Sequence, residues 1–331
     1  MIIQPIITQI LIFLRFFKIA FFSIVAILLT YKYIHMHIAI LTWWVSSERS
    51  IALSSGVNMN KWIHSACYTT EVFDFPIELD IFLNKYKTYD LVIPMFHGVY
   101  GEDGQVTAFL ETLGCPFAYS SFMVHSFCID KYRTNLFVAQ IWVKIPRSYY
   151  VPRGHSIEQL ESPLVCYPVI VKPNRWGSSL ATARVDSREE LIVAQQSIIG
   201  DDIIIQECIN GREFTVGVYR DSHGYSVLPI IEICTGDRFF DYSEKYETDG
   251  SNEVFAELPD SFRNSLEHQS ALIASALTCR GVVRIDWRYD GSDIYFLEVN
   301  TIPGFTSGSL VPKMWKKAGK TEKEFVEMLK Y

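Results

Sequence analysis

The chain has 331 residues, of which 49% are hydrophobic and 20% are charged, and its formal net charge at pH 7 is −7. This composition is typical of a globular protein of about two domains and excludes a disordered, collagen-like or coiled-coil chain. The acidic balance argues against nucleic acid as the main partner, because contacts to phosphates require a basic face.

Residues 1–35 are almost continuously apolar, with Arg15 and Lys18 near the centre of the segment. Two central cations make a poor membrane helix, and no small-residue cleavage site follows, as it would after a signal peptide. Three interpretations stay open: an extension ahead of a true start at Met36, a membrane anchor, and a signal-like segment. Membrane contact through residues 1–35 is therefore undecided.

From Met36 onward, strand-like and helix-like segments alternate, which predicts layered α/β structure. Short apolar runs predict strands at 38–43, 89–95, 168–172, 202–206, 214–219, 227–233, 282–287 and 294–299. Helical spacing predicts a helix between Gly104 and Gly114. Asp260 is expected to cap a second helix, and a capping box at Thr321–Glu324 opens the last one.

Seven cysteines without a CxxC pair fit a reducing compartment better than a disulfide scaffold or a zinc site. Cys208, Cys234 and Cys279 lie in apolar stretches and are expected to be buried. The cytoplasm is the expected location.

An acidic set near the C-terminus gives the first chemical signal. Asp286 lies in one predicted strand, and Glu298 and Asn300 lie in the next on one face, because strand side chains alternate. If the two strands pair, the three side chains converge as hard oxygen ligands, the type that holds magnesium against nucleotide phosphates. The alternative is that they are ordinary polar positions of an amphipathic hairpin. The small-residue loop that follows at 301–310 favours the metal site, since it can present backbone N–H groups to an anion.

The chain has neither a GxxxxGK[ST] P-loop nor a GxGxxG motif after a strand, so phosphates need another cradle. Lys172 ends a predicted strand, and the small, flexible loop at 174–179 is of the type that closes over phosphoryl oxygens. Each feature is weak alone, and their combination with the acidic set is more specific.

Several strings, in order along the chain, resemble the D-alanine–D-alanine ligase family of ATP-grasp enzymes. They are HGVYGEDG at 97–104, KP at 172–173 with GSS at 177–179, GRE at 211–213, YSEKY at 242–246, RID at 284–286 and EVNTIPG at 298–304. The resemblance runs from about Ile38 to Leu329 and leaves residues 1–35 without a counterpart. It implies the α/β (α+β) class, with a Rossmann-like, pre-ATP-grasp α/β domain at 36–125. A two-part ATP-grasp fold would follow, with a central subdomain at 126–206 and a C-terminal subdomain at 207–331.

The resemblance also implies roles for residues of this sequence. ATP would be held by Lys131, Lys172, Gln206, Glu207, Ile209 and Glu213, with the lysines on the phosphates and Glu213 on the ribose. Two magnesium or manganese ions would be bound by Asp286, Glu298 and Asn300. The implied catalytic residues are Glu48, Ser178, Lys245, Tyr246, Arg284 and Gly304. His97 and Glu48 would contact the first amino acid, and Ser309 and Leu310 would receive the carboxylate of the second.

In the family, the γ-phosphoryl group of ATP is transferred to the carboxylate of one D-alanine, and the amine of a second D-alanine attacks the acyl phosphate. Such a step is promoted mainly by positioning and charge neutralisation, which suits the lysines, Arg284 and the metal ions. Glu48, Ser178 and Tyr246 would hold loops closed over the substrates and exclude water. The resemblance thus implies D-alanyl-D-alanine synthesis for peptidoglycan, with D-alanine and ATP as small-molecule partners, in a cytoplasmic homodimer.

The chain departs from the family pattern in three places. Trp43 and Trp44 stand where relatives carry two glycines that allow close backbone approach to the first substrate. Trp176 replaces an acidic residue of the phosphate loop, and Gln206 stands where a glutamate often accepts from adenine. Ligation of D-alanine to D-lactate or D-serine is kept as an alternative, as is a non-catalytic nucleotide-binding protein.

Overall fold

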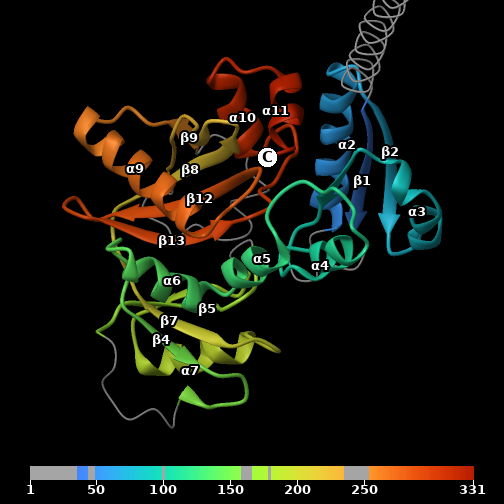
Figure 1. Ribbon diagram of the computed structural model, residues 1–331. Helices are drawn as coiled ribbons and strands as arrows, with labels where there is room; N and C mark the ends of the chain where they lie inside the picture. Colours follow the sequence, from blue (N-terminus) through green and yellow to red (C-terminus); the bar gives the residue numbers. More distant parts are fainter. Residues whose placement is uncertain (1–35, 44–48, 99–100, 158–165, 178–179, 235–252) are drawn as a thin grey trace, which may run out of the picture.

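The computed structural model describes residues 36–43, 49–98, 101–157, 166–177, 180–234 and 253–331. This part of the chain forms three sheets with helices packed on their faces (Figure 1). The mixture of helices and sheets confirms the predicted α/β class. The first and third sheets each lie within one predicted domain range, whereas β7 of the second sheet extends one residue past the predicted boundary at 206. Helix α5 spans the predicted boundary between residues 125 and 126.

The first sheet is parallel, with strand order β2-β1-β3. Its strands are β1 (His37–Trp43), β2 (Thr69–Phe75) and β3 (Leu91–Met95), connected through α2 (Arg49–Ser65) and through α3 (Leu79–Lys85) with the 3-10 turn η1 (Tyr86–Thr88). Residues Ile38 to Leu41 of the middle strand are fully buried. Such a continuous apolar run is typical of a strand covered on both faces.

Helices α4 (Gln105–Thr112), α5 (Phe122–Ile129) and α6 (Lys131–Gln140) lead from the first sheet to the second. The second sheet is antiparallel, with order β4-β7-β5-β6. Its strands are β4 (Ser148–Val151), β5 (Val169–Pro173), β6 (Ala183–Val185) and β7 (Ile203–Glu207), and α7 (Arg188–Ser197) packs against them through Leu191. Figure 1 shows α6 between this sheet and the third one.

The third sheet is antiparallel, with order β11-β10-β8-β12-β13 and with β9 paired to β8. Its strands are β8 (Arg212–Asp221), β9 (Gly224–Val227), β10 (Ile231–Ile233), β11 (Glu253–Phe255), β12 (Val282–Tyr289) and β13 (Ile294–Asn300). Helix α9 (Asp260–Ala276) packs on the sheet through Leu266 and Ile273. Helices α10 (Leu310–Lys317) and α11 (Glu322–Met328) end the chain.

The core of the first sheet continues into the C-terminal helices. Trp62 of α2 packs edge-on against Phe305 and Phe325, with ring centroids 4.8 and 5.2 Å apart. Phe325 belongs to α11, which lies beside α2 in Figure 1. The first sheet and the last part of the chain therefore share one hydrophobic cluster.

Two predictions about elements are wrong. The strand predicted at 227–233 is two strands, because β9 ends at Val227 and β10 begins at Ile231. Pro229 lies in the break, where it has no backbone N–H to give to a ladder. Asp260 is the first helical residue of α9 rather than its cap, a position held by Pro259 without a side-chain hydrogen bond.

The capping box of Thr321 and Glu324 at the start of α11 is confirmed. Among the cysteines expected to be buried, Cys279 is buried, Cys208 is intermediate and Cys234 is exposed. The expectation is wrong for Cys234, because it directly follows Ile233, the last residue of β10, and so lies outside the sheet.

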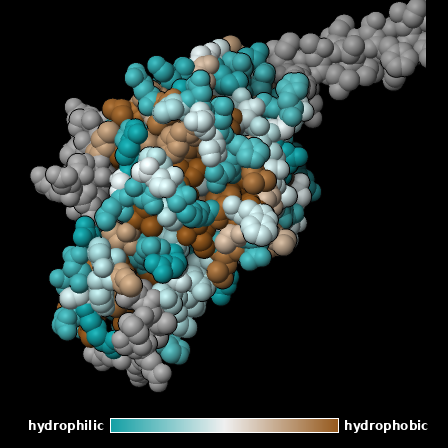
Figure 2. Space-filling view, turned by 90° about the vertical axis from the view of Figure 1, so that its left-hand side faces the viewer, coloured by the Kyte–Doolittle hydropathy of each residue, from teal (hydrophilic) through white to brown (hydrophobic). Residues whose placement is uncertain are grey.

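Hydrophobic residues gather in the middle of the face shown in Figure 2, with hydrophilic residues around them. Within the described residues, no helix combines the length and the apolar character needed to cross a membrane. The predicted extension at 1–35 lies outside these residues.

Replacing Gly211 with alanine is expected to lower the free energy of unfolding by about 3 kcal/mol. Gly211 has φ +135°, which L side chains rarely adopt, and an added Cβ would overlap the carbonyl oxygen of Tyr289. Gly224→Ala is the matched control, because Gly224 has φ +119° but no atom within 4 Å of its ideal Cβ. Urea denaturation should therefore show a clearly larger loss for Gly211→Ala. Equal losses would mean that the overlap is relieved at no cost.

Candidate active site

The acidic set lies on paired strands, as predicted. Asp286 of β12 is directly opposite Glu298 of β13, and Arg284 is opposite Asn300. The pairing contains a register shift between Asp286 and Trp287. The two carboxylates and the amide are therefore neighbours at one end of the hairpin.

Asp286 is the centre of a hydrogen-bonded network. Arg284 donates to both of its carboxylate oxygens, from Nε and Nη2, each at 3.0 Å. Thr215 of β8 donates to Oδ1 at 2.6 Å, and Asn300 donates from Nδ2 to Oδ2 at 3.0 Å. Since the side chains of Arg284 and Asp286 are only 20% and 13% exposed, their charges offset one another with little screening by water.

Lys131 brings a second cation to this network from another part of the chain. Asp130 caps α6 by accepting from the N–H of Arg133 at 3.0 Å, which places Lys131 at the first helical residue. Its Nζ donates to the carbonyl oxygen of Trp176 at 2.7 Å and lies 3.5 Å from Oε2 of Glu298. Lys131 thus joins the loop after β5 to the acidic strand β13.

The residues predicted to hold the nucleotide lie on the second sheet and at the start of β8. Lys172 lies on β5, and Gln206 lies on the neighbouring β7, where its Nε2 donates to Ser148 Oγ at 3.0 Å. Glu207 is paired with Arg147, which lowers the pKa of its carboxyl group. Ile209 follows β7 and is partly buried.

Glu213 shares a face of β8 with Thr215, two residues along the strand. Glu213 Oε2 lies 3.0 Å from Nη2 of Arg288, which is two residues from Asp286 on β12. The predicted ribose contact and the acidic set therefore occupy one continuous face of the third sheet.

His97 follows β3 and lies at the junction with the C-terminal part of the chain. Its Nε2 lies 3.0 Å from Oγ of Ser55 on α2. Burial lowers the pKa of His97 to about 4, the backbone of Ile302 acts in the opposite direction, and the positive charge of Arg284 adds to the lowering. His97 is consequently neutral at pH 7. It is also close enough to the network around Asp286 for the charge of Arg284 to affect its pKa.

The loop after Asn300 forms a tight turn into α10. Ser309 is the N-cap residue of that helix, and its Oγ accepts from the backbone N–H of Thr306 at 2.9 Å. A Cβ at Gly304 would lie 3.2 Å from the same oxygen, so Gly304 and Ser309 face each other closely. Leu310 begins α10 and is partly buried.

Four predicted site residues, Glu48, Ser178, Lys245 and Tyr246, lie outside the described residues, as does Trp44. Of the others, the structure brings Lys131, Arg284, Asp286, Glu298 and Asn300 into one network. It places Lys172 and Gln206 on the second sheet and His97, Gly304, Ser309 and Leu310 around the loop at 301–310.

The donor set on the hairpin fits a hard divalent cation. Asp286 and Glu298 offer carboxylate oxygens, and Asn300 offers an amide oxygen, the ligands that magnesium and manganese prefer. Within the described ranges, no group of three or more His, Cys, Asp or Glu side chains could hold a metal ion. The candidate set has two carboxylates and an amide, so phosphate oxygens would be needed to complete the coordination.

Sequence reasoning missed Thr215 and Ser55. The alternation of β8 could have indicated Thr215, since it shares the face of Glu213. Small residues at helical spacing, Ala52, Ser55 and Gly56, could have indicated a face of α2 in close contact with another element. Neither signal shows which distant residue is the partner.

A buried histidine on α5 was also missed. His125 is fully buried, its Nδ1 lies 2.6 Å from Thr301 Oγ1, and burial lowers its pKa to about 3. An unfolded histidine binds a proton near pH 6.5. Stability from neutral His125 is therefore fully present above pH 6.5 and is lost progressively as the pH falls towards 3.

Between pH 6.5 and pH 5, the stability of His125→Gln is expected to fall less steeply than that of the wild type, by about 1 kcal/mol per pH unit. Urea denaturation at several pH values measures both slopes. His97 contributes to both proteins, since its pKa is also lowered. Identical slopes would show that His125 binds its proton equally in the folded and unfolded states.

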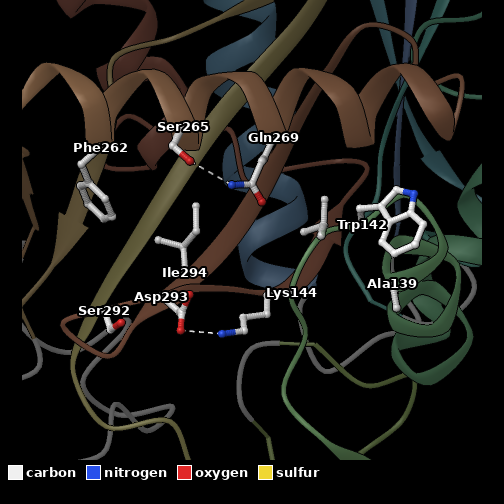
Figure 3. Close-up of a pocket in the computed structure, with 10 residues that line it drawn as sticks. Ala139, Trp142, Lys144, Phe262, Ser265, Gln269, Ser292, Asp293 and Ile294 are labelled. Atoms are coloured by element: carbon white, nitrogen blue, oxygen red, sulfur yellow. Dashed lines mark hydrogen bonds and ion pairs between the residues drawn. The ribbon is translucent and has the colours of Figure 1, made fainter.

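A separate pocket of about 560 Å³ lies between the end of α6, helix α9 and the turn from β12 to β13 (Figure 3). Lys144 and Asp293 form an ion pair of 2.5 Å on one wall, and Gln269 donates to Ser265 Oγ at 3.0 Å on another. None of its lining residues is a predicted nucleotide, metal or substrate contact. This pocket is therefore distinct from the candidate active site.

The chain is similar to one known protein family and to several of its members. Residues 139–330 match the family model described as the D-ala D-ala ligase C-terminus. The D-alanine–D-alanine ligase of Thermotoga petrophila is 35% identical over 298 residues, which cover 89% of this chain and 96% of that protein.

Solved structures are similar over the same share of the chain. The Bacillus anthracis D-alanine–D-alanine ligase complexed with ATP matches with a TM-score of 0.77 and 26% identity, covering 89% of this chain and 96% of that one. The VanG D-Ala:D-Ser ligase of Enterococcus faecalis matches with a TM-score of 0.72 and 25% identity, covering 89% and 98%. Both solved structures are thus similar in fold to this chain over 89% of its length.

Proposed function

The chain belongs to the D-alanine–D-alanine ligase family of ATP-grasp enzymes, and on this premise we propose that it joins its substrates at the network centred on Asp286. It is an ATP-dependent ligase that forms D-alanyl-D-alanine, a precursor of peptidoglycan. One observation supports the proposed site most directly. Arg284 is hydrogen-bonded to Asp286, Asp286 is opposite Glu298, and Lys131 is ion-paired with Glu298.

The first step transfers the γ-phosphoryl group of ATP to the carboxylate of one D-alanine, releasing ADP and forming an acyl phosphate. Lys131 and Lys172 neutralise phosphate charge, and Arg284 lies beside the reacting carboxyl group. The amine of the second D-alanine then attacks the acyl carbon, and inorganic phosphate leaves. Arg284 and the Gly304 backbone stabilise the oxygen that becomes negative in this step.

Asp286, Glu298 and Asn300 would hold two magnesium or manganese ions, which would neutralise charge on the nucleotide phosphates. Arg284 and Lys131 already lie against these carboxylates. Two cationic side chains thus lie next to the acidic set, where they could also contact the phosphates of ATP.

The other roles are assigned from the family pattern. Gln206, Glu207, Ile209 and Glu213 contact the adenosine part of ATP, while Ser309 and Leu310 receive the carboxylate of the second D-alanine. Glu48, Ser178, Lys245 and Tyr246 complete the site. The enzyme works as a homodimer in the cytoplasm, where ATP is plentiful.

The full chain should be incubated with ATP, magnesium and D-alanine, alone and with D-lactate or D-serine, and the products identified by mass. D-alanyl-D-alanine with one phosphate released per product is the expected result. Preference for D-lactate or D-serine would change the second substrate and keep the reaction type. ATP binding without any product would contradict ligase activity in this chain.

A further inference from the structure

Helix α2 has a buried face that contacts two functional segments. Ser55 is fully buried on this face, while the adjacent Ser54 is exposed. At Gly56, an added Cβ would overlap Cγ2 of Thr42 on β1. The helix therefore packs closely against the first sheet at Gly56, the residue next to Ser55.

The Ser55 hydroxyl links His97 to the backbone of Phe305. Its Oγ accepts from the Phe305 N–H at 3.1 Å and lies 3.0 Å from Nε2 of His97. When the proton of the neutral His97 ring is on Nδ1, the Ser55 hydroxyl donates to Nε2 while its oxygen accepts from Phe305. One hydroxyl then serves both partners.

Two further residues of α2 hold the same residue of the loop. Asn58 Nδ2 donates to the carbonyl oxygen of Phe305 at 2.9 Å, and the ring of Trp62 packs against the Phe305 ring. Residues 55, 58 and 62 lie on one side of a helix, because they are three and four residues apart. Both backbone polar groups and the side chain of Phe305 are thus fixed by one helix.

We propose that Ser55 is a positioning residue for the ligation, whose hydroxyl fixes Phe305, and with it the Gly304–Leu310 loop, relative to His97. The inference rests on the proposed function, in which this loop receives the carboxylate of the second D-alanine. Phe305 directly follows Gly304, and the next residue, Thr306, donates to Ser309 Oγ. The hydrogen bond between Ser55 and Phe305 therefore positions the loop that receives the second D-alanine, although Ser55 itself lies outside that loop.

Loss of the hydroxyl should affect the acceptor site selectively. A displacement of the loop by a fraction of an ångström weakens carboxylate binding strongly, because oriented hydrogen bonds depend steeply on geometry. The predicted nucleotide residues lie on α6, on the second sheet or just after it, and at the start of β8, whereas Ser55 hydrogen-bonds to His97 and Phe305, so ATP binding should be little affected. A merely structural role would instead reduce thermal stability and leave the ratio of the substrate constants unchanged.

The test compares Ser55→Ala with Ser54→Ala in the full chain, by measuring the two KM values for D-alanine and the KM for ATP. Ser55→Ala is expected to raise the KM of the second D-alanine about 10- to 100-fold and to change the KM for ATP less than about threefold. Ser54→Ala should match the wild type. Asn58→Ala provides an independent variant, since Asn58 is only half-buried, and should also raise the KM of the second D-alanine.

The inference would be overturned if the KM of the second D-alanine is unchanged in both Ser55→Ala and Asn58→Ala. It would also be overturned if every KM rises equally. If Ser55→Ala does not fold, Asn58→Ala alone decides. A wild-type chain without dipeptide product would instead contradict the proposed function. The two failures are therefore distinguishable.

Discussion

Replacing Glu298 with glutamine is expected to reduce kcat by at least about a thousandfold. The amide has nearly the same size as the carboxylate, so β13 should keep its pairing with β12. The substitution removes the negative charge opposite Asp286 and next to Lys131, the charge that the proposed metal site requires. Phosphate release and dipeptide mass measure the loss, and thermal denaturation verifies that the variant is folded.

Glu189→Gln is the matched control for this substitution. Glu189 is exposed in the first turn of α7 and lies on another element. Its replacement should leave kcat unchanged. A folded Glu298→Gln protein with wild-type kcat would show that Glu298 has no part in the reaction.

Replacing Lys131 with methionine is expected to lower kcat/KM for ATP by about 100- to 1,000-fold. Methionine keeps an unbranched side chain one atom shorter and removes the cation that lies between Trp176 and Glu298. Lys131 is only 9% exposed, so its charge acts on phosphates with little screening. Initial rates at varied ATP concentration measure the effect.

Lys144→Met is the matched control, because Lys144 follows the same helix α6 but is exposed and paired with Asp293. Its rate constants should equal those of the wild type. Similar losses in the two variants would mean that general electrostatics, rather than the position of Lys131, determines ATP use.

Much of the site could be predicted because its signals are local. Strand alternation places Glu298 and Asn300 on one face, and the short spacing from Asp286 makes a hairpin the natural connection. The structure confirms the pairing of the two strands. The motifs that begin at His97 and that contain Asn300 could also be recognised from sequence, since each lies within one continuous segment.

The partners of these residues could not be predicted, because they depend on contacts between distant parts of the chain. Thr215 reaches Asp286 across 71 positions, and Ser55 reaches Phe305 across 250. Such contacts follow from the packing of sheets and helices, which no local pattern specifies. The break at Pro229 was readable in principle, since proline cannot donate to a strand ladder.

The shared cluster of α2, Phe305 and Phe325 has a consequence for how the protein is made. The ribosome releases β1, α2 and β2 long before Phe305 and Phe325, the aromatic residues that pack on Trp62. Until those residues emerge, Trp62 and its neighbours on α2 have no apolar cover on that side. The N-terminal domain is therefore expected to complete its core only after α11 has left the ribosome, and to expose apolar surface on α2 until then.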